Sequence, residues 1–242
     1  DITILYTGLI YMLSFFVIFY CGKLVYDLLH KGFKLNEELV KKDNPALALS
    51  LVGYYSGLVL CIGGALVGPS QDLIQDLIAL AIYGFSGIAL LNISWFLCDS
   101  LLLPSFKIKD EIIRDQNQGT GAVLGAACLA SGFILFGAIQ GEGTYLTMLA
   151  YWGSGQILLV LAMKMYNLTT PYDVHGAIEK DNVAAGVSCA GAVVSMGVLI
   201  GLVGEQDFTT WTGLLANYLV YAAIGLAILP LVRWLVDKLL LP

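Results

Sequence analysis

The chain has 242 residues, of which 58% are hydrophobic and only 12% are charged, and its mean hydropathy is +0.82. Soluble domains carry charge on about a quarter of their residues, so this composition excludes a soluble globular protein and predicts an integral membrane protein. We therefore expect the lipid bilayer as its surroundings and no nucleic acid as a partner.

Seven apolar segments are each long enough to cross a bilayer, which needs about 20 such residues. They cover residues 2–26, 45–67, 73–98, 119–140, 144–166, 183–204 and 209–236. The connectors between them alternate in kind. Those at 27–44, 99–118 and 167–182 are long and charged, and those at 68–72, 141–143 and 205–208 are short and carry no base. The predicted fold class is an all-α integral membrane protein with seven transmembrane helices.

Basic residues are confined to the side of the long connectors. All twelve lie there: Lys23, Lys31, Lys34, Lys41, Lys42, Lys107, Lys109, Arg114, Lys164, Lys180, Arg233 and Lys238. The opposite side carries acids alone: Asp1, Asp72, Asp76, Glu142, Glu205 and Asp207. Because loops rich in Lys and Arg stay in the cytosol, we expect the long connectors and the C-terminal end to be cytosolic and the N-terminus to lie outside.

Three short charged segments share one layout and each ends in an asparagine, after which an uncharged run rich in Gly and Ala begins. These segments, here called lead-ins, are residues 37–44, 110–117 and 175–182. Their recurrence predicts a repeat of two helices, and since two helices return the chain to its starting side, successive repeats are parallel. We predict a single transmembrane domain, 1–242, with repeats at about 1–71, 72–142 and 143–208 and an incomplete one at 209–242.

The last segment supports the incomplete repeat. Residues 237–242 resemble residues 99–104, which lead into the connector that ends at Asn117. We therefore expect a fourth lead-in and an eighth helix in the native protein.

Glycines lie one helical turn apart in the second, fourth and sixth spans. The pairs are Gly53 and Gly57, Gly121 and Gly125, Gly137 and Gly141, and Gly197 and Gly201. Small residues at this spacing let helix backbones approach closely, so these spans are predicted to form a tightly packed inner layer. The alternative that the glycines shape a narrow pore or a hinge stays open.

Asn-led helices rich in Ala and Gly, arranged in tandem, resemble a known family. The runs that carry the resemblance are Asn44-Pro45-Ala46-Leu47-Ala48 and Asn182-Val183-Ala184-Ala185-Gly186. The chain resembles, along essentially its whole length, the YjfL-like family of bacterial inner-membrane proteins (domain of unknown function 350). The resemblance implies a multi-pass bacterial inner-membrane protein, and the family brings no agreed reaction, substrate or cofactor.

The residues at the starts of the Gly-rich helices are the first candidates for function. They are Asn44, Asp43, Asn117, Asp115, Asn182 and Asp181. One interpretation is N-capping, in which a side-chain oxygen accepts bonds from free main-chain N–H groups. The others are a ring of donors and carboxylates at a cytosolic mouth, and docking of a partner.

A second set recurs in one register along the other helices. Asp27, Asp99, Asn167 and Asp237 end these helices, and Ser14, Ser86 and Ser154 lie thirteen residues before the first three. An acid at a helix C-terminus opposes the helix dipole, so either interfacial ion pairs with nearby bases or a proton or cation relay would explain the acids. Interhelical hydrogen bonding would explain the serines.

No motif of catalysis or metal binding is present. The five cysteines form no CxxC, and His30 and His175 are expected on solvated surface, so we expect no metal, no cofactor and no enzymatic activity. We predict a non-enzymatic scaffold or subunit of a larger membrane assembly, with protein partners or further copies in the membrane. The alternative is an ion channel or proton-coupled transporter with a path along the pseudo-symmetry axis.

Overall fold

The computed structural model describes residues 2–68, 70, 72–103, 107–141, 143–205 and 210–239, with no side chain described at 108, 233, 236, 237 or 239. Over these ranges the chain forms helices and turns. The long helices are α1 (Ile2–Leu29), α2 (Pro45–Val67), α3 (Leu73–Leu97), α5 (Gln118–Gln140), α6 (Tyr145–Thr169), α8 (Val183–Gly204) and α9 (Trp211–Leu239). All seven are long and apolar enough to cross a membrane, which confirms the predicted fold class.

Short helices occupy the connectors. Two are π-helical, η1 (Glu37–Lys41) and η2 (Cys98–Leu102), and two are α-helical, α4 (Ile108–Ile113) and α7 (Val174–Glu179). The elements η1, α4 and α7 lie in the three lead-ins. The sequence predicted these segments as charged connectors, and their helical form is new information from the structure.

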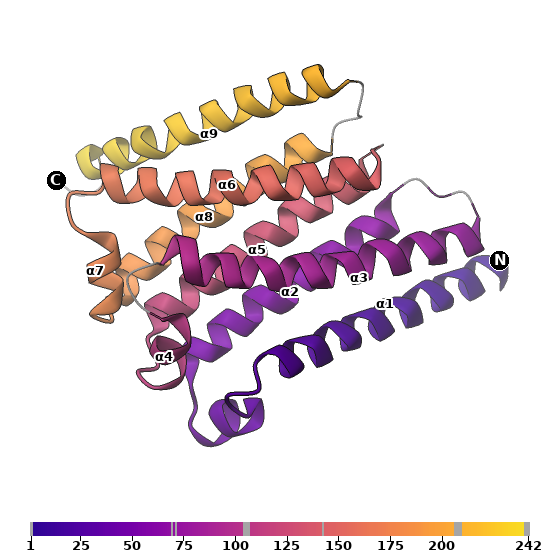
Figure 1. Cartoon of the computed structure of the whole chain (residues 1–242), viewed down its shortest axis with the longest axis horizontal. Coiled ribbons are helices and arrows are strands. Elements are labelled where there is room, and N and C mark those ends of the chain that lie inside the picture. The colour runs from indigo at the N-terminus through magenta and orange to yellow at the C-terminus, as the bar shows by residue number, and fades with distance from the viewer. Residues whose placement is uncertain are drawn as a thin grey trace.

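The long helices form two layers (Figure 1). One layer contains α1, α3, α6 and α9. The second, here called the inner layer, contains α2, α5 and α8, with α5 between the other two and in extensive contact with both. The lead-in helices α4 and α7 lie at one end of the molecule, and the N-terminus lies at the opposite end (Figure 1). We call the first the cap end and the second the turn end.

Backbones touch within the inner layer because glycines lie at the crossings. A Cβ added to Gly132 of α5 would lie 2.6 Å from the Cα of Gly57 in α2, and one added to Gly201 of α8 would lie 2.5 Å from the main-chain oxygen of Phe133. Real side chains do not fit at such distances. The close packing that the glycine spacing predicts is therefore present, on both sides of α5.

Burial falls from the inner layer outward. In the most apolar stretch of α5, 78% of the residues are buried, compared with 6% in α1 and 11% in α9. Large apolar side chains of α1 are exposed, including Leu13, Phe16 and Tyr20. An apolar surface of this extent would be unfavourable in water, and in a bilayer it is the surface that contacts lipid.

Candidate functional site

Each inner-layer helix begins at an asparagine that caps it. The side-chain oxygen accepts a hydrogen bond from the main-chain N–H three residues later, which is the N-cap geometry. These bonds join Asn44 to Leu47 (3.0 Å), Asn117 to Thr120 (2.9 Å) and Asn182 to Ala185 (3.1 Å). In α2, Pro45 follows at the first helical position, where the absence of an N–H has no cost.

The residue before each asparagine has a left-handed backbone conformation. The φ angles are 50° at Asp43, 53° at Gln116 and 60° at Asp181, and these are the non-glycine residues with positive φ in the described part of the chain. This conformation turns the chain from the lead-in helix into the long helix, and it costs energy for a residue with a Cβ. Two of the predicted mouth residues, Asp43 and Asp181, thus lie at strained turns.

The side-chain amides of two caps reach across to the following lead-in. Asn44 donates through Nδ2 to the main-chain oxygen of Ile112 at 2.8 Å, and Asn117 donates in the same way to Ile178 at 2.6 Å. Both asparagines are 1% exposed. A buried amide with all its groups paired fixes two elements relative to each other, because leaving any of those groups unpaired is costly. Each cap therefore fastens its own helix to the lead-in of the next inner helix.

Asn182 differs from the other two caps. It is exposed, and its amide nitrogen has no partner among the residues that the structure describes. The described hydrogen bond of its side chain is the cap bond from the main-chain N–H of Ala185.

Buried glutamates accompany the first two caps. Glu38 is 3% exposed and accepts a bond from Lys42 at 2.7 Å, and Glu111 is 8% exposed and accepts a bond from Asn117 at 3.0 Å. Burial raises the pKa of Glu111, and the bond from Asn117 opposes this effect. Asp115, the remaining mouth candidate, is exposed and paired with Arg114, whose hydrogen bond lowers the pKa of Asp115.

The acids and amides of the predicted register have different surroundings. Asp27 is exposed and forms no ion pair with a described residue. Asp99 lies in η2 and interacts with another residue. Asn167 accepts a hydrogen bond from the main-chain N–H of Val174 at 2.9 Å and so holds α7. Asp237 lies in α9, but its side chain is outside the described part of the structure.

The three serines make different contacts. Ser86 of α3 lies 3.0 Å from the hydroxyl of Tyr145 at the start of α6, which is an interhelical contact. Ser154 donates to the main-chain oxygen of Ala150 in its own helix. Ser14 is half-buried. Interhelical bonding is thus seen for Ser86.

His30 is packed where solvated surface was expected. Its ring stacks on Tyr26 with centroids 4.1 Å apart and meets Trp95 edge-on at 4.5 Å. Its Nδ1 lies 2.9 Å from the main-chain oxygen of Tyr26, and its Nε2 is buried without a described partner. Burial lowers the pKa of His30, and the nearby Lys109 adds to this effect. Local sequence does not reveal this packing, because the aromatic partners come from two different helices, α1 and α3.

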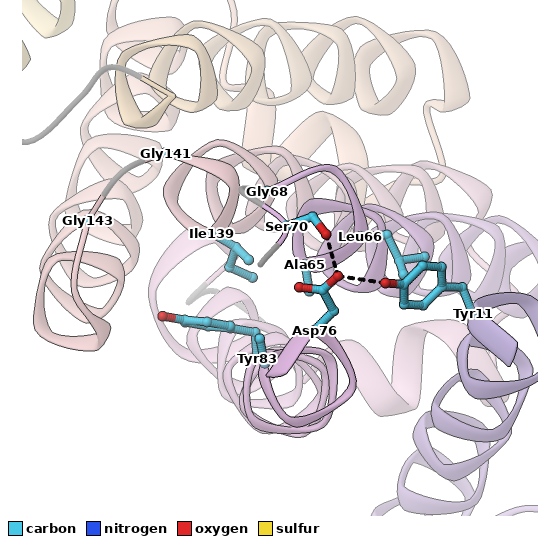
Figure 2. Close-up of a pocket in the computed structure, with 11 residues that line it drawn as sticks. Tyr11, Ala65, Leu66, Gly68, Ser70, Asp76, Tyr83, Ile139, Gly141 and Gly143 are labelled. Atoms are coloured by element: carbon cyan, nitrogen blue, oxygen red, sulfur yellow. Dashed lines mark hydrogen bonds between the residues drawn. The ribbon is translucent and has the colours of Figure 1, made fainter. Parts of the chain in front are cut away.

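A cavity of about 330 Å³ at the turn end was also not predicted. Figure 2 shows Asp76 at its centre, with Tyr11 and Ser70 pointing toward its carboxylate. The carboxylate accepts hydrogen bonds from the hydroxyl of Tyr11 at 2.6 Å and from that of Ser70 at 2.5 Å. Tyr83 and Ile139 complete the wall. The cavity can hold a small polar or cationic molecule, since it combines an acid with aromatic rings.

Within the described ranges, no three His, Cys, Asp or Glu side chains lie close enough together to hold an ion.

Comparison with known proteins agrees with the membrane architecture. A UPF0719 transmembrane protein of Aquifex aeolicus (strain VF5) is 24% identical over 195 residues, which cover 78% of this chain and 69% of that protein. No solved structure matches. The family model described as Domain of Unknown Function (DUF350) matches residues 2–139 and 142–242, and with nearly every residue covered the chain belongs to this family of multi-pass membrane proteins.

Proposed function

We propose that the protein is a non-enzymatic component of the bacterial inner membrane, a scaffold or a subunit of a larger assembly. The observation that carries this proposal is the solid inner layer. Its helices meet backbone to backbone. For example, a Cβ added to Gly57 of α2 would lie 2.8 Å from the main-chain oxygen of Cys128 in α5. Transport needs a path with room for its substrate, whereas close backbone packing gives a rigid body.

The use of the buried polar groups supports the same proposal. Asn44 and Asn117 spend both their oxygen and their amide nitrogen on main-chain partners. The same amides also donate to Glu38 and Glu111, so these bonds fix one helix against the next and occupy the polar atoms of both side chains. In this proposal the mouth candidates are structural caps.

The cap end is the docking face in this proposal. Positive and negative side chains are exposed there side by side, for example Lys41, Asp43, Lys107, Asp110 and Lys180. The confinement of basic residues to this end supports a cytosolic location. A mixed-charge surface offers ion pairs to a protein partner without attracting nucleic acid.

Two measurements test the proposal, the first on the purified chain and the second on membranes that contain it. In vesicles carrying a proton or potassium gradient, we expect flux equal to that of empty vesicles. Native electrophoresis of gently solubilised membranes is expected to show a complex larger than one chain. A gradient-driven flux above that of empty vesicles, or a chain that migrates alone, would overturn the proposal.

The turn-end cavity favours a second candidate, an ion- or proton-coupled channel or transporter. Asp76 lies within the first turn of α3 and faces a cavity large enough for a small solute. In this case the vesicle flux would exceed the background, and Asp76→Asn would lower it. Asp72→Asn is the matched control, because Asp72 caps the same helix without lining the cavity.

A further inference from the structure

The outer face of α8 repeats a pattern that the two other inner helices use for packing. Counted from the capping asparagine, residues two, six, nine and thirteen positions later face the next inner helix. In α2 these are Ala46, Ser50, Gly53 and Gly57, all buried, and α5 lies against them. A Cβ on Gly125 of α5 would meet the main-chain oxygen of Leu49 at 2.5 Å and the Cα of Ser50 at 3.5 Å.

The same register packs α5 on α8. Its members in α5 are Gly119, Val123, Ala126 and Ala130, and they too are buried. Gly186 of α8 abuts the backbone of Gly119, and a Cβ on Gly197 would lie 2.9 Å from the main-chain oxygen of Ala130. Two successive interfaces therefore follow one rule.

In α8 this register is uncovered. Its members are Ala184, Ser188, Gly191 and Ser195, and all four are exposed. A Cβ placed on Gly191 would have nothing within 4 Å, although Gly53 at the same position of α2 abuts the backbone of Gly125. This face consists of small residues, and nothing in the described part of the chain covers it.

The cap of α8 also lacks one of the bonds that the other two caps make. Asn44 and Asn117 each donate to a main-chain oxygen in the lead-in of the next inner helix, at Ile112 and Ile178. Asn182 has the same cap bond but no described acceptor for its amide. The exposed face of α8 and the amide of Asn182, which has no acceptor in the described part of the chain, are the two places where α8 lacks contacts that α2 and α5 make.

The other end of the inner layer argues against a second copy stacked head to tail. The outward face of α2 carries Val52 and Val59, which are 65% and 44% exposed. At the corresponding positions α5 has Gly125 and Gly132, which permit its close approach. Bulky side chains suit contact with lipid, and they would hold α8 of a neighbouring copy away.

We propose that the outer face of α8 binds a partner membrane helix of the α5 type. This helix runs parallel to α8, begins at an asparagine, and has small residues where α5 has Gly121, Gly125 and Gly132. A lead-in precedes it and offers a main-chain oxygen to the amide of Asn182. The inference rests on the proposed function as a subunit, and it names the contact through which the assembly grows.

A fragment of this chain, residues 105–141, can test the proposal, because it contains a lead-in and α5. Gly53 faces Gly125, so Gly191 is expected to face Gly125 of the bound fragment. We would co-express the fragment carrying Cys128→Ser and Gly125→Cys with the full chain carrying Cys21→Ser and Gly191→Cys, since the other native cysteines of the full chain are buried. Oxidation is expected to link chain and fragment.

Two controls make the result specific. Val52→Cys in the full chain, in place of Gly191→Cys, is expected to give no link, and Gly132→Leu in the fragment is expected to abolish the link at Gly191.

A fragment that is present in the membrane but forms no link to the full chain overturns the proposal. A dominant link between two full chains through Gly191 also overturns it and assigns the face to a second copy. These outcomes are independent of the flux measurement, so a failure of the docking inference can be told apart from a failure of the proposed function.

Discussion

The amide nitrogen of Asn117 lies 2.6 Å from the main-chain oxygen of Ile178, 61 residues further along the chain. The same side chain caps α5 through its oxygen, so one residue joins the start of α5 to the lead-in of α8. Asn44 makes the equivalent pair of bonds one repeat earlier. The stability of the cap end is therefore expected to depend on the donors of these asparagines as well as on their acceptors.

Asn117→Asp separates the two roles of this side chain. The aspartate keeps the cap acceptor but loses the donor to Ile178 and places a carboxylate beside Glu111. Leaving a buried carbonyl unpaired costs about 1–3 kcal/mol, so the variant is expected to unfold at lower denaturant concentration in detergent. Asn182→Asp is the control, because its amide has no described partner, and it should leave the unfolding midpoint nearly unchanged. Equal losses at the two sites would contradict this account.

Gly132→Ala tests the backbone contact between α5 and α2. The added Cβ would lie 2.6 Å from the Cα of Gly57, so the helices must separate. Overpacking of this kind costs about 1–3 kcal/mol and outweighs the gain of about 1 kcal/mol in helix propensity. In Gly153→Ala the added Cβ has nothing within 4 Å, and the propensity gain should remain. Thermal unfolding in detergent is expected to move in opposite directions for the two variants.

Gln116→Gly addresses the strained turn before α5. Gln116 has a φ of 53°, a conformation that glycine adopts without a Cβ penalty. We expect a stabilisation of about 1 kcal/mol from relief of this strain. Gln116→Val should destabilise, because branching at Cβ makes the same conformation worse. If both variants have the same unfolding midpoint as the wild type, the left-handed turn contributes nothing to stability.

Glu111→Gln is expected to change how stability depends on pH. Burial raises the pKa of Glu111 above its ordinary value of 4.5, so the folded protein binds the proton more tightly than the unfolded chain. The wild type should therefore lose stability as the pH rises from 4.5 through the raised pKa. Glutamine keeps an acceptor for Asn117 and stays neutral, so the variant should be more stable than wild type at pH 7 and equal to it near pH 4. Unfolding midpoints across this range provide the measurement, and a variant less stable at pH 7 would contradict the sign.

His30→Phe is expected to remove a pH dependence of opposite sign. Burial lowers the pKa of His30 below 6.5, with Lys109 acting in the same direction and the bond to Tyr26 and the charge of Asp27 acting against it. Below pH 6.5 the unfolded chain binds a proton that the folded protein resists, so wild-type stability should fall as the pH decreases through this window. Phenylalanine keeps the stacking on Tyr26 but cannot ionise. The difference in melting temperature between pH 7.5 and pH 5.5 should therefore be smaller in this variant.

The spans were predictable because a change from charged to apolar residues marks where they begin. Charged lead-ins end at Asn44 and Asn182, so the apolar runs that follow give α2 and α8 the bounds that the structure has. Helices α1 and α6 continue three residues past their predicted ends, to Leu29 and Thr169, because a helix can extend beyond its apolar stretch into polar residues.

The lead-in helices were not predictable, because five or six residues are too few for helical periodicity to be read. Packing stabilises them: Ile112 is 3% exposed and Ile178 is 0% exposed. The contacts at the candidate sites depend on pairings between distant segments. Tyr11 and Asp76 are 65 residues apart, and nothing in either local sequence marks the other.

The direction of the cap bonds sets an order on biosynthesis. Asn44 is translated 68 residues before Ile112, the residue whose oxygen its amide needs, and Asn117 is translated 61 residues before Ile178. In a nascent chain that has inserted only its first hairpin, the amide of Asn44 thus lacks its main-chain acceptor. Each of these two bonds can therefore form only after the following lead-in has been synthesised.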